Sequence, residues 1–123
     1  MWVISKEFCF EAAHRLPNLP PEHKCSWLHG HSFRFRLHVT GELDPLLGWV
    51  TDFGGLLKAA GNMIVQSLDH RCLNDVEGLE NPTSEMLALW IYKQVKLTQL
   101  DIVAVEVSET CGTSVRYDPP GAV

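Results

Sequence analysis

The chain has 123 residues, of which 46% are hydrophobic and 20% are charged, so its length allows one globular domain over residues 1–123. Lys, Arg, Asp or Glu interrupts every stretch of membrane-spanning length, which excludes a transmembrane helix and a membrane partner. The N-terminus lacks the layout of a signal peptide, so we expect a cytoplasmic protein. Ten Lys and Arg against fifteen Asp and Glu give a formal charge of -5, which argues against nucleic acid as the main partner.

The first part of the chain predicts two strands. Alternating apolar residues indicate strands over residues 8–14 and 29–40, joined by a loop rich in proline. The apolar face of the first strand ends at His14, and the matching face of the second begins with His29 and His31. His38 falls on the other face of the second strand, where we expect a surface residue.

Two helices are expected in the middle of the chain. The apolar period changes to three and four residues after Asp52, which can cap a first helix. A second helix is expected to open near residues 81–84, with Trp90 in its buried stripe. The buried face of the first helix should contain Phe53, Leu56, Leu57, Ala60, Ile64 and Leu68.

The last part predicts two more strands, over residues 101–109 and 113–117. Val103, Val105 and Val107 share an apolar face that ends in Glu109. The order strand, strand, helix, helix, strand, strand predicts an α+β domain, with a four-stranded antiparallel sheet covered on one face by two helices. Open edges in so small a sheet predict pairing with another subunit.

Three histidines form the main chemical signal. His29 and His31 project from the same face of their strand, and antiparallel pairing would place His14 beside His29. Three imidazole ligands with an open fourth position are typical of a catalytic zinc site. Packed or hydrogen-bonded histidines are the alternative interpretation.

Cysteines form the second signal. Cys25 lies on the loop four residues before His29, from which its thiolate could reach over a metal. The alternative is a small buried hydrophobic residue, which is the interpretation that fits Cys9, Cys72 and Cys111. Lys24, next to Cys25, could assist the thiolate or be a solvated loop residue.

Carboxylates and hydroxyls form the third signal. Asp69 could orient His70 as a proton relay, although a histidine at a helix C-terminus is also common. Glu109 is either solvated or aimed at a ligand such as a pterin or guanine, which offers two adjacent N–H groups. Thr83 and Ser84 could line the same pocket, and helix capping explains them equally well.

Six ordered segments together resemble the 6-pyruvoyltetrahydropterin synthase family over nearly the whole chain. The spacing Cys-x-x-x-His-Gly-His is similar to the bacterial branch of queuosine biosynthesis, whereas the animal branch has a longer gap. The presence of Cys25 also differs from the branch in which glutamate replaces this cysteine for aldolase chemistry on dihydroneopterin. The matching segments are Phe10–His14, Cys25 with Leu28–His31, Asp52–Phe53, Leu68–His70, Asn81–Glu85 and Glu109–Thr110.

The resemblance implies a tunnelling fold (T-fold), in which subunits join their sheets into a trimeric barrel and two trimers stack into a homohexamer. It implies active sites between subunits, a Zn²⁺ cofactor and a pterin triphosphate substrate. The implied reaction converts 7,8-dihydroneopterin triphosphate to 6-carboxy-5,6,7,8-tetrahydropterin, acetaldehyde and triphosphate, which makes the protein a carbon-carbon lyase.

The same resemblance implies a role for each candidate residue. Cys25 would be the general base, Asp69 and His70 the proton relay, and Glu109 the anchor of the pterin ring. The implied zinc ligands are His14, His29 and His31, and the implied substrate contacts also include Thr83, Ser84, Lys24 and Arg15.

Two other functions stay open at this point. The product could be 6-pyruvoyltetrahydropterin, or the chain could be a non-catalytic zinc-stabilised assembly module. A closed structural zinc site would need a fourth protein ligand at a position such as Cys25.

Overall fold

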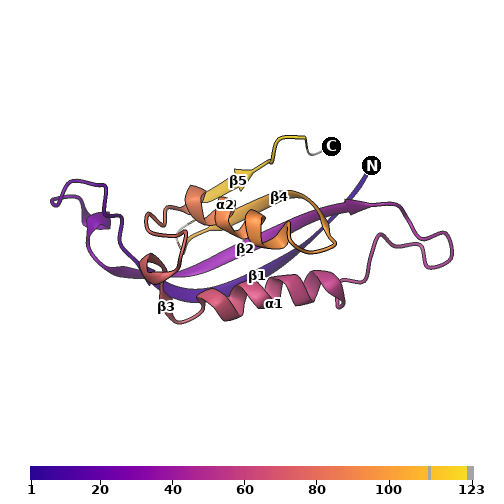
Figure 1. Ribbon diagram of the computed structural model, residues 1–123, viewed down its shortest axis with the longest axis horizontal. Coiled ribbons are helices and arrows are strands. Elements are labelled where there is room, and N and C mark those ends of the chain that lie inside the picture. The colour runs from indigo at the N-terminus through magenta and orange to yellow at the C-terminus, as the bar shows by residue number, and fades with distance from the viewer. Residues whose placement is uncertain (111, 122–123) are drawn as a thin grey trace.

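The computed structural model describes residues 1–110 and 112–121, which form a twisted sheet with both of its helices on one face (Figure 1). The four expected strands are present and pair antiparallel, which confirms the α+β class. A fifth strand of two residues runs parallel to the first and was not expected, because two residues carry no periodic pattern. In the order β3-β1-β2-β4-β5, the strands are β1 (Trp2–His14), β2 (His29–Gly41), β3 (Arg71–Cys72), β4 (Asp101–Ser108) and β5 (Ser114–Tyr117).

The two helices cover the sheet side by side. Helix α1 (Leu56–Leu68) packs on β1, and α2 (Ser84–Val95) packs on β4 and β5 (Figure 1). Two single 3-10 turns, η1 (Lys24–Ser26) and η2 (Leu73–Asp75), lie in the connecting loops. Within the described residues, neither helix has the length and apolar character needed to cross a membrane.

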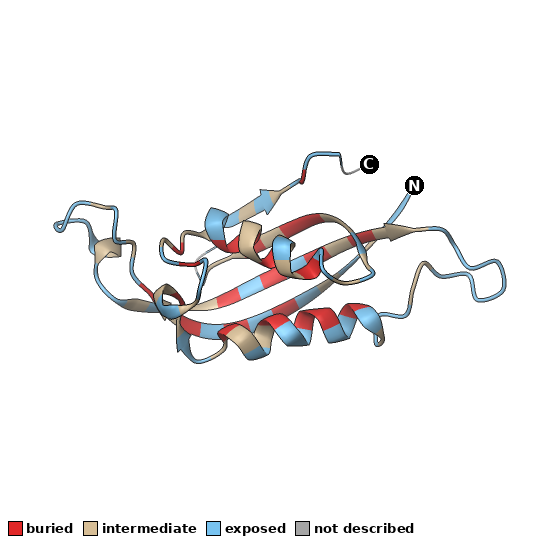
Figure 2. Cartoon of the chain, viewed as in Figure 1, coloured by how far each residue is buried: buried red, intermediate tan, exposed pale blue. Residues whose placement is uncertain are grey.

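The core lies between the sheet and the helices, where buried residues alternate along β1 and β2 (Figure 2). Phe8 stacks on Phe35 and Phe10 on Phe33, each pair with ring centroids 5.2 Å apart. Full burial of one such ring contributes about 1.5–3 kcal/mol. Helix α1 approaches this layer closely at Gly61, where an added Cβ would overlap the Phe8 ring.

Helix α1 begins later than the sequence predicts. Asp52 does not cap it: Gly54 donates its backbone N–H to Asp52 Oδ1 at 2.8 Å, and Gly55 occupies the cap position. Such short-range bonds from aspartate compete with helix formation and close a turn instead. Phe53 and Leu56 are therefore exposed, at 51% and 42%, and the prediction that they lie on the buried face was wrong.

A β-bulge changes the face of β4. The register of β2 with β4 shifts between His38 and Val39, so that Val39 pairs with Ile102. Ile102, in place of Val103, therefore packs against the core. The prediction for Val103 was wrong because an extra residue in one strand leaves no mark in the apolar alternation.

Three polar or aromatic residues also differ from expectation. His38 is largely buried, and its Nε2 lies 2.8 Å from Glu106 Oε2 on the neighbouring strand. Trp90 is half-buried, since its indole N–H reaches out to the Glu77 carbonyl at 3.1 Å. Cys9 is exposed on the helix-free face and Cys72 is half-buried, so neither is the fully buried residue expected; Cys111 lies outside the described residues.

Candidate functional site

The strand register brings three histidines together at one end of the sheet. His14, the last residue of β1, pairs directly with His29, the first residue of β2, and His31 lies on the same face. Their ring centroids are 4.6–5.2 Å apart. One nitrogen from each ring lies within 4.8 Å of the others, so the group could hold a metal ion.

Hydrogen bonds fix two of these rings. His14 Nδ1 lies 2.8 Å from the Pro82 carbonyl, and His29 Nδ1 lies 2.7 Å from the Trp27 carbonyl. Since a carbonyl oxygen only accepts, each Nδ1 carries the proton and each Nε2 keeps its lone pair. The two lone pairs are thereby available to a metal.

His14 supplies a direct test of whether a metal fits. The residue is 1% exposed, and its Nε2 has no hydrogen-bond partner. A buried polar atom without a partner is costly, and a metal ion would satisfy it. Burial is the main reason that the pKa of His14 lies below its ordinary value of 6.5, and nearby His29 and His31 lower this pKa further. Both effects favour the neutral imidazole that binds metals, and the residues therefore fit zinc.

Glu109 and Ser84 lie beside the histidines, which is one of the alternatives that the sequence left open. Glu109 follows the last residue of β4, and its Oε2 lies 3.4 Å from His31 Nε2. Ser84, the first residue of α2, donates its hydroxyl to Glu109 Oε1 at 2.8 Å. The end of β4 and the start of α2 thus place one carboxylate beside the three histidines.

Thr83 performs the capping role that the sequence left open. Its Oγ1 accepts the backbone N–H of Met86 at 3.1 Å, so the hydroxyl serves the N-terminus of α2. The effect on the site is indirect, because this cap fixes where Ser84 begins the helix.

Cys25 lies in η1, where the backbone is held firmly. Its N–H donates to His23 Nδ1 at 3.0 Å, and its carbonyl accepts from Leu16 N at 2.8 Å. The half-buried thiol does not belong to the three-histidine group, which gains no fourth histidine, cysteine or carboxylate within the described residues. This leaves a coordination position open, which is typical of catalytic zinc sites and not of closed structural ones.

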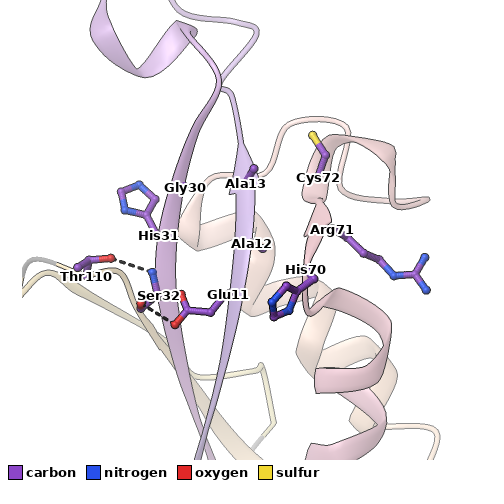
Figure 3. A pocket seen from close by; sticks show the side chains of 10 residues that line it. All are labelled: Glu11, Ala12, Ala13, Gly30, His31, Ser32, His70, Arg71, Cys72 and Thr110. Carbon is purple, nitrogen blue, oxygen red and sulfur yellow. Dashed lines mark hydrogen bonds between the residues drawn. The ribbon is translucent and has the colours of Figure 1, made fainter.

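Asp69 and His70 lie away from the three histidines within one chain. In Figure 3 the strands β1 and β2 run between His31 and His70. His70 is 79% exposed, and it lines an open cavity of about 650 Å³ together with Glu11, Ser32 and His31. The sequence places Asp69 and His70 correctly at the end of α1; neither belongs to the three-histidine group, although His70 shares a cavity with His31.

The Asp69–His70 corner is tied to the backbone of Glu11. Asp69 Oδ1 accepts the Glu11 N–H at 2.9 Å, while the His70 N–H donates to the Glu11 carbonyl at 2.6 Å. Asp69 Oδ2 lies 3.0 Å from His70 Nδ1. The Glu11 N–H chiefly, and then the His70 ring, hold the pKa of Asp69 below its ordinary value of 3.8. His70 adopts φ 60°, a left-handed conformation that is uncommon for residues other than glycine.

Two of the expected substrate contacts, Arg15 and Lys24, are exposed on the loop beside this end of the sheet. Arg15 is fixed through its backbone, because its N–H donates to Asn74 Oδ1 at 3.0 Å and its carbonyl accepts from Asn74 Nδ2 at 2.8 Å. Lys24 opens η1. Sequence reasoning missed Asn74 and the carbonyls of Pro82 and Trp27, since backbone acceptors carry no residue-type signal.

The element order and the histidine site are those expected of the T-fold class. A family model described as 6-pyruvoyl tetrahydropterin synthase matches residues 3–120. The chain belongs to the 6-pyruvoyl tetrahydropterin synthase family. It is similar to the solved structure of 6-pyruvoyl tetrahydropterin synthase from Caenorhabditis elegans, with a TM-score of 0.84 and 27% identity over 96% of this chain and 95% of that one.

Curated relatives come from more than one branch of the family. A 6-carboxy-5,6,7,8-tetrahydropterin synthase from Synechocystis is 44% identical, and the alignment covers 98% of this chain and 95% of the relative. The human 6-pyruvoyl tetrahydrobiopterin synthase is 32% identical over 93% of this chain and 89% of the relative. A dihydroneopterin monophosphate aldolase from Pyrococcus furiosus is 42% identical, but over 56% of each chain.

Proposed function

We propose that this protein is a zinc-dependent carbon-carbon lyase that converts 7,8-dihydroneopterin triphosphate to 6-carboxy-5,6,7,8-tetrahydropterin, acetaldehyde and triphosphate. The observation that carries the proposal is the group of three histidines with Glu109 3.4 Å from His31. The 44% identity to the Synechocystis enzyme of that name supports this product over the pyruvoyl one. The reaction would serve queuosine biosynthesis in the cytoplasm.

His14, His29 and His31 would hold the zinc, because they offer three nitrogens within 4.8 Å and an orphaned buried lone pair. When bound, zinc supplies a Lewis acid that makes protons on the side-chain hydroxyls and adjoining carbons of the substrate easier to remove. The chain itself must then orient the pterin and move those protons.

Glu109 would anchor the pterin ring. A carboxylate offers about four lone-pair sites, of which Ser84 uses one and His31 faces another. Each oxygen therefore retains capacity to accept one of two adjacent N–H groups on the ring. Such a bidentate contact would hold the substrate side chain over the histidines, an orientation effect.

Proton transfer would come from two parts of the protein. Cys25 would act as general base on the substrate side chain, and Asp69 with His70 would relay the proton. Because Figure 3 shows β1 and β2 between His70 and His31, the relay would reach the metal centre from another subunit. The sheet edges at β3 and β5 are open in one chain, which supports joining of sheets into a barrel and a homohexamer. Arg15 and Lys24 would bind the triphosphate.

Product analysis tests the proposal. Zinc-loaded protein is incubated with 7,8-dihydroneopterin triphosphate, and the products are identified by mass spectrometry, with Cys25→Ala as the matched variant. We expect carboxy-tetrahydropterin and acetaldehyde from the wild type, and retained zinc without turnover from Cys25→Ala. A pyruvoyl product would move the protein to the biopterin branch. Loss of zinc in Cys25→Ala, without wild-type turnover, would favour the zinc-stabilised assembly module.

A further inference from the structure

Each of the three histidine rings has one nitrogen close to a polar partner outside the group, and these partners differ. His14 and His29 each bond to a backbone carbonyl, at 2.8 Å and 2.7 Å. His31 instead lies against a carboxylate, with 3.4 Å between its Nε2 and Glu109 Oε2. Of these three partners, Glu109 alone is a side chain and carries a charge.

Glu109 is itself held in place. Its other oxygen, Oε1, accepts the Ser84 hydroxyl at 2.8 Å, and Ser84 is fixed as the first residue of α2 by the Thr83 cap. The side chains of Glu109 and His31 are 25% and 20% exposed, so their interaction is only partly screened by solvent. The contacts from Ser84 to Glu109 and from Glu109 to His31 therefore connect the start of α2 to a candidate metal ligand.

We propose that Glu109 is a positioning residue of the metal centre, which acts through His31 in addition to its contact with the pterin. The carboxylate orients the His31 ring, and its negative charge favours a divalent cation on that ring. Partners of this kind change metal affinity by about 10- to 100-fold when they are removed. The inference rests on the proposed zinc site, but it does not depend on the proposed reaction.

The structure offers a matched control for this pair. Glu106 also contacts a histidine, with its Oε2 2.8 Å from His38 Nε2, and this pair lies on the same sheet but outside the three-histidine group. Glu106→Gln therefore removes the same charge from the same kind of contact. His29→Ala provides the reference for loss of the metal site.

The test is zinc affinity, measured by competition with a chromophoric chelator on the metal-free full chain. We expect Glu109→Gln to bind zinc about 10- to 100-fold more weakly than wild type. Ser84→Ala should show a smaller loss, and Glu106→Gln should show none. The visible spectrum of the cobalt(II)-loaded protein should shift in Glu109→Gln and not in Glu106→Gln. Circular dichroism of the metal-free variants checks that each is folded.

Each outcome separates this inference from the proposed function. Zinc affinity and a cobalt spectrum unchanged in Glu109→Gln would overturn the inference, while a wild type that still forms the carboxy product would keep the proposed function. The expected loss of zinc affinity in Glu109→Gln, together with a wild type that forms no product, would keep the inference and overturn the proposed function. A wild type that binds no zinc would overturn both. If Glu109→Gln does not fold, Ser84→Ala decides, and unchanged affinity in that variant would count against the inference.

Discussion

The three histidines and the Asp69–His70 corner lie near the same end of β1, but the chain holds them differently. His14 is 1% exposed and is fixed by strand register and a buried carbonyl, whereas His70 is 79% exposed and is held through the backbone of Glu11. The first group is assembled within one chain. The second group lies at a different corner of the chain, and in the function proposed above a second subunit brings it to a metal centre. The comparison separates the proposed metal site from the proposed proton relay, so that each can be altered by a substitution that leaves the other intact.

The largest effect should come from removal of a metal ligand. We expect His29→Ala to abolish stoichiometric zinc binding and all turnover, because two imidazoles are left where three converge. Zinc content by elemental analysis after gel filtration measures the change. His38→Ala is the control, since His38 lies on the same strand but contacts Glu106 instead of the group. Normal zinc content in His29→Ala would contradict the assignment of the three histidines as the metal site.

His70→Asn should affect turnover through the Asp69–His70 corner and leave the three-histidine group intact. Asparagine tolerates the left-handed backbone at this position, so the fold and the zinc content should be unchanged. Turnover should fall by about 10²- to 10⁴-fold, which is the usual contribution of a positioned acid or base. Steady-state kinetics on zinc-loaded enzyme gives the value. A loss of zinc from His70→Asn as large as its loss of turnover would mean that the three histidines and the Asp69–His70 corner form one structural unit.

Gly61→Ala tests whether the packing of α1 on β1 affects the Asp69–His70 corner more than the three histidines. An added Cβ would overlap the Phe8 ring, so α1 must move away from β1, at a cost of about 1–3 kcal/mol. Because Asp69 follows α1 directly, turnover should fall more than zinc affinity. Denaturant unfolding gives the stability change, with Ala60→Gly on the same helix as a cavity-forming control. Unchanged stability in Gly61→Ala would contradict the close approach.

The smallest effect concerns acid stability at the exposed corner. The pKa of Asp69 is lowered in the folded protein, so its ionised form stabilises the fold above pH 3.8, and this stability is lost as pH falls toward the folded pKa. Asp69→Asn should be less stable than wild type near pH 6, and the difference should shrink below pH 3.8. Thermal unfolding between these pH values, with Asp101→Asn as an exposed control, measures it. A difference independent of pH would contradict the carboxylate's role.

Strand periodicity explains why so much of the metal centre could be predicted. Residues two apart share a face, so His29 and His31 could be placed together, and antiparallel pairing added His14. The position of Glu109 beside His31 was only one of two open alternatives, because the end of a strand fixes no direction for a long side chain. The combination with Ser84 depends on how α2 packs, which is a tertiary feature.

Other parts could not be predicted for identifiable physical reasons. The carbonyls of Pro82 and Trp27 orient two rings, yet any residue type supplies a carbonyl. The bulge after His38 shifts β4 by one position without altering its apolar composition. Asp52 carries a capping side chain that closes a turn instead, since both uses suit aspartate.

Complementation between two impaired variants tests the central claim most directly, namely that one active site combines the histidines of one chain with the Asp69–His70 corner of another. His29→Ala and His70→Asn proteins are each assayed alone, then co-refolded together in varied ratios and assayed again. The account predicts no turnover from His29→Ala alone, only the strongly reduced turnover of His70→Asn alone, and higher turnover from the mixture, greatest near equal amounts. A mixture as inactive as its components, with mixed oligomers verified by mass spectrometry, would contradict it.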